Sequence, residues 1–181
     1  MMDQNRVNFR AWYVDTLELL YPRRGAGIAV FMIALPLLER YLRQANQRTA
    51  EDELNAGCWR TLRTLFPTLS SDKAASDFWT ACRQGFVHQA TLSMRAKGAR
   101  SAPAASLTHD IVIDPVTLNP DGSFVIHPVL FSKLVVRTIE QDFAVFAGAG
   151  TPAVPLPKIV ATAPPADGLI VPSISPKMRI P

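Results

Sequence analysis

The chain has 181 residues, which suits one domain and is too short for two of ordinary size. Hydrophobic residues make up 48% of it and charged residues 19%, which excludes general disorder because a packed core can form. The formal net charge of +4 permits contact with nucleic acid or an acidic partner without requiring it. The basic surplus lies mainly in residues 1–100, so we expect a polyanion to meet that part first.

The N-terminal residues contain no apolar segment, so we expect no signal peptide. The most apolar stretch, residues 25–38, is shorter than the about 20 residues that span a bilayer. Cys58 and Cys82 lie among apolar residues and are expected to be buried thiols in a reducing compartment. With three scattered histidines they form no metal-ligand spacing. These features predict a cytoplasmic protein with no membrane association, metal or cofactor.

Two helices are predicted in the first 45 residues, over 5–21 and 27–45. The second is apolar almost all round before Glu39, which makes it the expected central helix. Pro36 lies inside it and predicts a kink or a split. The apolar stripes are Phe9, Trp12, Tyr13, Leu17 and Leu20 in the first helix, and Ile28, Phe31, Leu35, Leu38 and Leu42 in the second.

Two further helices are predicted in the middle of the chain. Residues 49–52 resemble a capping box with Asp in place of Glu, so a helix is expected to start there and to stop at Pro67. Ser71 can cap the next helix, which is expected to run to about Met94. Their apolar stripes are Leu54, Cys58, Leu62 and Leu65 in the first, and Phe78, Cys82 and Phe86 in the second.

The C-terminal part of the domain contains the expected β structure. Residues 95–108 are rich in Ala, Ser and Gly and predict a loop. The turn-forming run 119–122 separates apolar residues 111–113 from 124–126, which predicts a β-hairpin. A last helix is expected from Pro128, carrying Phe131, Val135, Ile139, Phe143 and Phe146 and ending at Gly148.

Residues 151–181 hold eight of the 15 prolines, so no long helix can form there. They are nevertheless more apolar than a typical disordered tail. We expect this segment either to be mobile or to lie extended over an apolar groove or a protein partner, and residues 169–171 are candidates for pairing with a sheet edge. The predicted fold is therefore an all-α bundle of about five helices over residues 1–150, with a small β-hairpin insert and a proline-rich extension.

One polar stripe stands out on the fourth predicted helix. Thr80, Gln84 and His88 recur at a spacing of four, and Arg83 flanks them. A histidine with a pKa of about 6.5 can move protons at a ribose hydroxyl, and the planar arginine fork matches phosphate oxygens. At roughly 100° per residue, positions 83 and 88 are about 140° apart on a helix. A second copy of the chain facing the first would bring both side chains to one phosphate.

The run Arg83-Gln84-Gly85-Phe86-Val87-His88-Gln89-Ala90 resembles the HEPN superfamily, which consists of small helical bundles with an Arg and a His on a late helix. Position 84 is Gln, where the family more often has Asn, Asp or His. The resemblance implies metal-independent RNA cleavage by a homodimer, in a toxin or phage-defence setting. It implies Arg83 and His88 as catalytic residues, with Gln84 and Thr80 supporting them.

Arg95, Lys97 and Arg100 follow this helix and could bind RNA phosphates, with a solvated loop as the alternative. His109 and His127 are expected to be turn or cap residues. The alternative function is a non-catalytic helical binding or assembly module, since some members of the superfamily have no activity. An exposed pair of Arg83 and His88 in a cleft at a two-fold interface would distinguish the two.

Overall fold

The structure is a computed structural model that describes residues 4–83, 104–110 and 114–148 of the chain. Over these ranges the chain is mainly helical with one small three-stranded sheet, which confirms the predicted helical bundle with a β insert in outline. The predicted extension, residues 151–181, lies outside the described residues. So do Phe86 and the rest of the helix expected to run to Met94.

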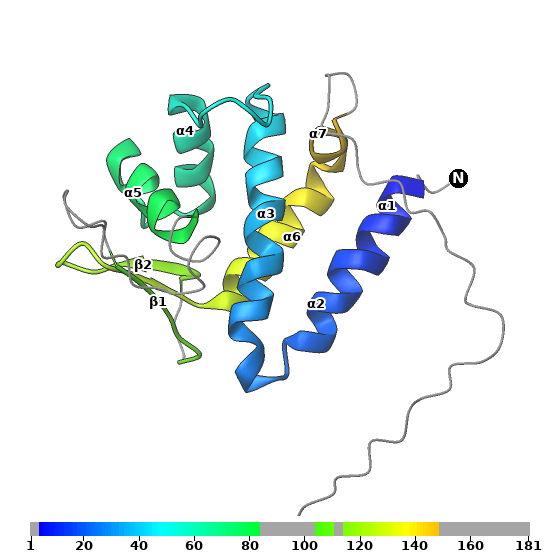
Figure 1. The fold of residues 1–181 in the computed structure, drawn as a ribbon, viewed down its shortest axis with the longest axis horizontal. Helices are drawn as coiled ribbons and strands as arrows, with labels where there is room; N and C mark the ends of the chain where they lie inside the picture. Colours follow the sequence, from blue (N-terminus) through cyan, green and yellow to red (C-terminus); the bar gives the residue numbers. More distant parts are fainter. Residues whose placement is uncertain (1–3, 84–103, 111–113, 149–181) are drawn as a thin grey trace, which may run out of the picture.

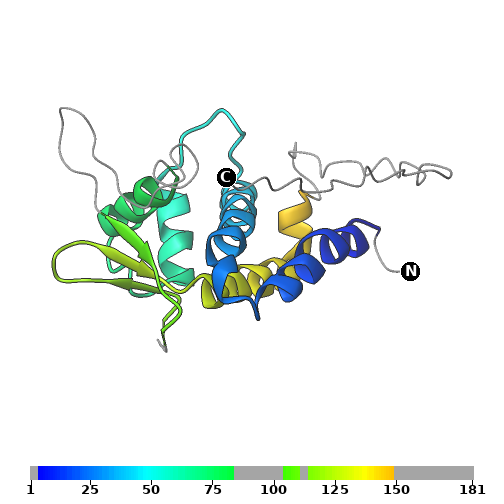
Figure 2. The same ribbon diagram turned by 60° about the horizontal axis from the view of Figure 1, so that its bottom comes forward.

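The longest helix, α3 (Gly27–Ala45), runs through the middle of the molecule, as Figure 1 shows. In both views α4, α5 and the sheet lie on one side of it and the N-terminal helix lies on the other (Figure 2). Its most extensive packing is against α6. The helices are α1 (Gln4–Phe9), α2 (Asp15–Leu20), α3, α4 (Ala56–Leu65), α5 (Asp72–Cys82), α6 (Pro128–Gln141) and α7 (Phe143–Ala147), with the short turns η1 (Arg10–Val14) and η2 (Arg24–Ala26).

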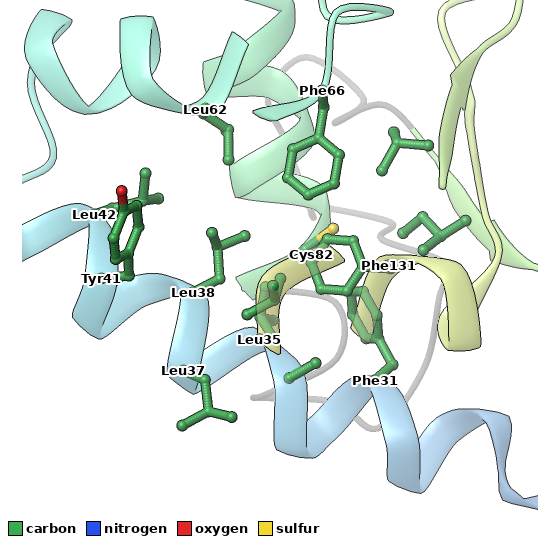
Figure 3. Close-up of a cluster of buried hydrophobic side chains, with 14 of the residues drawn as sticks. Phe31, Leu35, Leu37, Leu38, Tyr41, Leu42, Leu62, Phe66, Cys82 and Phe131 are labelled. Atoms are coloured by element: carbon green, nitrogen blue, oxygen red, sulfur yellow. The ribbon is translucent and has the colours of Figure 1, made fainter. Parts of the chain in front are cut away.

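The core lies where α3, α4, α5 and α6 meet, and aromatic rings fill its centre. Phe131 of α6 stacks on Phe66 with ring centroids 5.2 Å apart and contacts Phe31 of α3 at 4.9 Å (Figure 3). Because these elements come from distant parts of the sequence, the rings hold the bundle together. Most of the predicted stripe residues at the centre of the bundle are buried, namely Phe31, Leu35, Leu38, Leu62, Phe78, Cys82 and Phe131. Ile28, predicted on the same stripe as Phe31, is 55% exposed. Both cysteines are buried free thiols, as predicted.

The N-terminal helix differs from the predicted stripe at Trp12. The chain between α1 and α2 forms the π turn η1, in which each turn contains more residues than in an α-helix. The buried residues Phe9 and Val14 on either side of it are therefore five positions apart. The extra residue rotates Trp12 out of the core, so that its side chain remains 48% exposed. The prediction that Trp12 belongs to the buried stripe is therefore wrong.

The central helix α3 continues across Pro36 as a single α-helix, so the predicted split does not occur. Pro36 is exposed while its neighbours Leu35 and Leu37 are buried. The ring therefore lies on the surface side of α3, and the apolar contacts on the other side keep the helix intact.

The capping box predicted at residues 49–52 does not start a helix. Asp52 does accept a hydrogen bond from the Thr49 amide at 2.8 Å, but α4 begins only at Ala56. The N-cap is Asn55, whose Oδ1 accepts from the amides of Gly57 and Cys58. Ser71 caps α5 as predicted, because its hydroxyl accepts from the Ala74 amide.

The sheet has the order β1-β3-β2. β2 (Val116–Leu118) and β3 (Phe124–Ile126) form the predicted antiparallel hairpin around residues 119–122, but the first strand comes later than expected, and residues 111–113 lie outside the described residues. β1 (Ala105–Leu107) lies in the segment predicted to be a loop, so that prediction is wrong for these residues. Its pairing is parallel to β3, a contact that the turn chemistry of a hairpin does not predict.

The last predicted helix is confirmed, with a break near its end. Pro128 occupies the first turn of α6, which stops at Gln141. After Asp142 the chain continues as α7, and Gly148 ends it with a positive φ of 77°. His127 is the N-cap of α6, which confirms the expected capping role of this histidine.

Candidate functional site

Arg83 is the only one of the two predicted catalytic residues that lies within the described part of the chain. It follows Cys82 at the end of α5, and its backbone is still helical at φ −69° and ψ −49°. Its side chain is 46% exposed, and one guanidinium nitrogen lies 3.7 Å from Glu39 Oε1 on α3. Glu39 therefore holds the guanidinium of Arg83 against α3 while leaving much of it open to solvent.

Glu39 is shared with a second arginine, Arg43, one turn further along α3. Arg43 donates to Glu39 Oε1 from Nε at 3.0 Å and from Nη2 at 2.8 Å. Its Nη1 donates to the carbonyl oxygens of Thr49 at 2.7 Å and Asp52 at 2.6 Å. Arg43 is thus buried and fully engaged in fastening the segment after α3, and it also fixes the carboxylate that contacts Arg83.

A hollow of about 210 Å³ lies beside this ion cluster, and we refer to it as the arginine hollow. Arg40 and Arg43 both line it and together outweigh the single carboxylate of Glu39, so the surroundings are cationic. Burial lowers the pKa of Arg40 and the nearby Tyr13 raises it, but an arginine remains charged at neutral pH. The lining residues are Pro36, Glu39, Arg40, Arg43, Gln44 and Ala50.

Glu39, Arg40 and Arg43 were not predicted from the sequence as site residues. Glu39 and Arg43 are spaced i, i+4 on a helix, the spacing at which opposite charges meet. That spacing was readable from the sequence. The contact to Arg83 was not, because it joins residues on two helices that are remote along the chain.

The other predicted site residues are only partly described. Thr80 is partly buried, and its hydroxyl donates to the Ser76 carbonyl within α5 at 2.8 Å. That bond occupies its proton, so any support for a neighbouring residue would come from the oxygen lone pairs. Gln84, His88, Arg95, Lys97 and Arg100 lie outside the described residues.

An apolar groove of about 280 Å³ adjoins the arginine hollow, and we refer to it as the Trp12 groove. Pro36 and Arg40 line both. The guanidinium of Arg40 lies over the Phe146 ring at 5.0 Å, and its Nε donates to the Phe146 carbonyl at 3.1 Å. The groove is lined by Trp12 and Tyr13 of η1, by Met32, Ile33, Pro36, Leu37 and Arg40 of α3, and by Phe146 of α7.

The remaining described histidines form a separate pair where α3 and α6 begin. The rings of His109 and His127 are 6.1 Å apart, and a Cβ at Gly27 would lie 2.6 Å from His109 Nε2. Glycine at position 27 therefore allows this close approach. His127 Nδ1 accepts from the Leu130 amide at 3.2 Å, which requires that nitrogen to be unprotonated.

This cap makes the stability of the protein depend on pH. Burial lowers the pKa of His127, and the neighbouring His109 lowers it further, against a raising effect from the residue's own backbone. The unfolded chain therefore takes up this proton at a higher pH, so stability falls as the pH drops below about 6.5. We expect the Tm of the wild type to fall between pH 7.5 and pH 5 by more than that of His127→Asn, which keeps a capping oxygen but does not titrate. Parallel Tm curves for the two proteins would contradict this role.

Among residues 4–83, 104–110 and 114–148, no group of three potential metal ligands comes together. None of the helices described over these ranges combines the length and the apolar character needed to cross a membrane. The chain matches no protein-family model, no curated protein and no solved structure.

Proposed function

We propose that the protein is a metal-independent endoribonuclease of the HEPN type that acts as a homodimer. The observation that carries the proposal is the placement of Arg83, whose half-exposed side chain lies 3.7 Å from Glu39, one of the residues that line the arginine hollow. A guanidinium with one loose partner is open to a phosphate, and a cation at that position can stabilise the charge that develops in the transition state. The resemblance of residues 83–90 supplies His88 as the partner that moves the proton.

The arrangement of charges also agrees with an RNA substrate. Glu39 has to be shared between Arg43 and Arg83, and its 3.7 Å contact with Arg83 is the looser of the two. A phosphate that approaches Arg83 therefore displaces a weak partner at little cost. Arg43 keeps Glu39 in place during this exchange, because its own contacts with the carboxylate are shorter.

Cleavage of total RNA by the purified chain tests the proposal. We expect cleavage to persist in EDTA, and we expect His88→Ala to reduce its rate by roughly 10²-fold or more, the usual contribution of a general acid or base. Arg83→Lys should also lose most activity, because lysine keeps the charge but not the forked contact. The Tm of His88→Ala should stay within a few degrees of the wild type if the residue acts in catalysis rather than packing.

Arg63→Lys is a matched control for Arg83→Lys. Arg63 is 42% exposed and pairs with Asp72 at 2.9 Å, so it resembles Arg83 in exposure and in having one carboxylate partner. It lies on α4, and the same substitution there should leave cleavage unchanged. Equal cleavage by wild type and His88→Ala, purified in the same way, would show that the RNA is cut by something other than this site.

A second candidate function is that of a non-catalytic helical binding module, and the Trp12 groove favours it. Exposed, contiguous apolar surface with a charged rim is typical of surfaces that bind another segment or protein. The groove provides an aromatic wall from Trp12 and Tyr13 and a cation from Arg40. Absence of RNA cleavage together with binding of an apolar peptide that Trp12→Ala abolishes would establish this function instead.

A further inference from the structure

The Trp12 groove is left uncovered by the residues that the structure describes. Trp12 is 48% exposed, and Met32 on α3 is also exposed. Both side chains line the Trp12 groove together with Pro36. Trp12 belongs to the π turn η1 and lies outside the buried set that includes Phe9, Val14 and Leu17. A local irregularity thus presents a large aromatic side chain to an open apolar surface.

The described chain ends at the edge of this groove. Phe146 of α7 forms part of its wall, and Gly148, the last residue described, ends α7 in the left-handed conformation. The Tyr41 hydroxyl donates to Asp142 Oδ2 at 2.9 Å, which ties the start of α7 to α3. The last described residue, Gly148, thus follows two positions after a residue of the groove wall.

The lengths of the groove and of the following segment are compatible. From Met32 to Arg40, α3 extends about 12 Å at a rise of roughly 1.5 Å per residue. Gly148 ends the helix α7, and from there the chain to Pro152 can reach about 14 Å when extended. Polyproline II rises by about 3.1 Å per residue, so four residues are enough to cover the groove. A segment that starts near Pro152 can therefore reach the groove and lie along it.

The sequence from Pro152 to Pro157, Pro-Ala-Val-Pro-Leu-Pro, has the composition that aromatic-lined grooves bind. Proline-rich segments lose little entropy on binding, because the ring already restricts the backbone. The three-residue repeat of polyproline II would place Val154 and Pro157 on one edge and Lys158 on another. Apolar side chains could then face the groove while the lysine stays away from Arg40.

We propose that residues 152–157 bind in the Trp12 groove of the same chain. The inference rests on the second candidate function, that the groove is a binding surface, and it is independent of RNA cleavage. The bound segment covers Trp12 and Met32 and occupies the apolar surface next to the arginine hollow.

The experiment uses the full-length chain with its three tryptophans labelled by fluorine and followed by ¹⁹F NMR. Trp12, Trp59 and Trp79 are assigned by single Trp→Phe substitutions. The test variant is Val154→Asp/Leu156→Asp, and the matched control is Ile174→Asp/Ile180→Asp, which adds the same charge further along the same segment and outside residues 169–171. A synthetic peptide of residues 151–161 is then added to the test variant.

We expect the test variant to shift the Trp12 resonance alone, the control variant to leave it in place, and the peptide to restore it. An unchanged ¹⁹F resonance of Trp12 in the test variant would overturn the inference. If the peptide nevertheless shifts Trp12 in that variant, the groove binds such segments and only the intramolecular docking is wrong. If the peptide shifts nothing, the binding function itself fails. A Trp12 shift that appears only with a concentration-dependent dimer mass would assign the segment to a second copy and also overturn the inference.

Discussion

Replacing Phe131 by alanine is expected to destabilise the protein by about 3–5 kcal/mol, the usual cost of removing a fully buried aromatic ring. Phe131 has no exposed surface, stacks on Phe66 and contacts Phe31 and Phe78. Phe78 also contacts Phe124 of β3, so this chain of rings connects α3, α5, α6 and β3. These elements cannot all move in to fill the space that the Phe131 ring leaves behind. Urea unfolding followed by circular dichroism measures the loss.

Leu19→Ala provides the control for this prediction. Leu19 is an exposed apolar residue on α2, and its truncation should change the free energy of unfolding by less than about 0.5 kcal/mol. The loss of unfolding free energy for Phe131→Leu should lie between those for Phe131→Ala and Leu19→Ala, because leucine retains part of the buried volume. A loss below about 1 kcal/mol for Phe131→Ala would mean that the rings do not form the centre of the core.

Replacing Arg43 by alanine is expected to cost about 2–4 kcal/mol. Its side chain is only 6% exposed, and removal leaves Glu39 and the carbonyls of Thr49 and Asp52 without their donor. The cost is below that of breaking a fully buried ion pair, about 3–5 kcal/mol, because the Glu39 side chain keeps 24% of its surface exposed. Thermal and urea unfolding both report the change.

The control for Arg43 is an arginine in an exposed ion pair. Arg10 donates to Glu140 at 2.9 Å, yet the arginine side chain is 53% exposed, so Arg10→Ala should cost at most about 1 kcal/mol. The two ion-pair distances are nearly equal, but Arg43 is buried and also donates to the carbonyls of Thr49 and Asp52, whereas Arg10 is exposed. Equal losses in the two variants would contradict the role assigned to the network around Arg43.

The Arg43 network also connects stability with the candidate site. Glu39 contacts both Arg43 and Arg83, so removing Arg43 releases one of the two cations that hold the carboxylate. We expect Arg43→Ala to bring Glu39 closer to Arg83 and to weaken any phosphate contact made there. This effect is distinct from unfolding and is measured at a temperature where the variant is still folded.

Helical spacing and capping residues predicted most of the helices because these are local properties. The stripe Phe31, Leu35 and Leu38 is buried as its spacing predicts, and Ser71, Pro128 and Gly148 mark helix ends as expected. For the candidate site, the sequence predicted Arg83 and Thr80 on one helix. It did not predict which carboxylate contacts Arg83, because Glu39 lies on another helix and their meeting depends on how α3 and α5 pack.

By itself, the sequence determined the mainly helical class, the buried stripes of α3 to α6 and the hairpin turn at residues 119–122, since each depends on neighbours a few positions apart. Tertiary structure decided the rest. The parallel pairing of β1 with β3 needs two distant segments to meet. Arg43 holds the carbonyls of Thr49 and Asp52 in the segment before α4, where a capping box predicts a helix start. The exposure of Trp12 depends on a π turn that periodicity does not predict, because one extra residue in a turn redirects a side chain without changing the pattern of apolar residues.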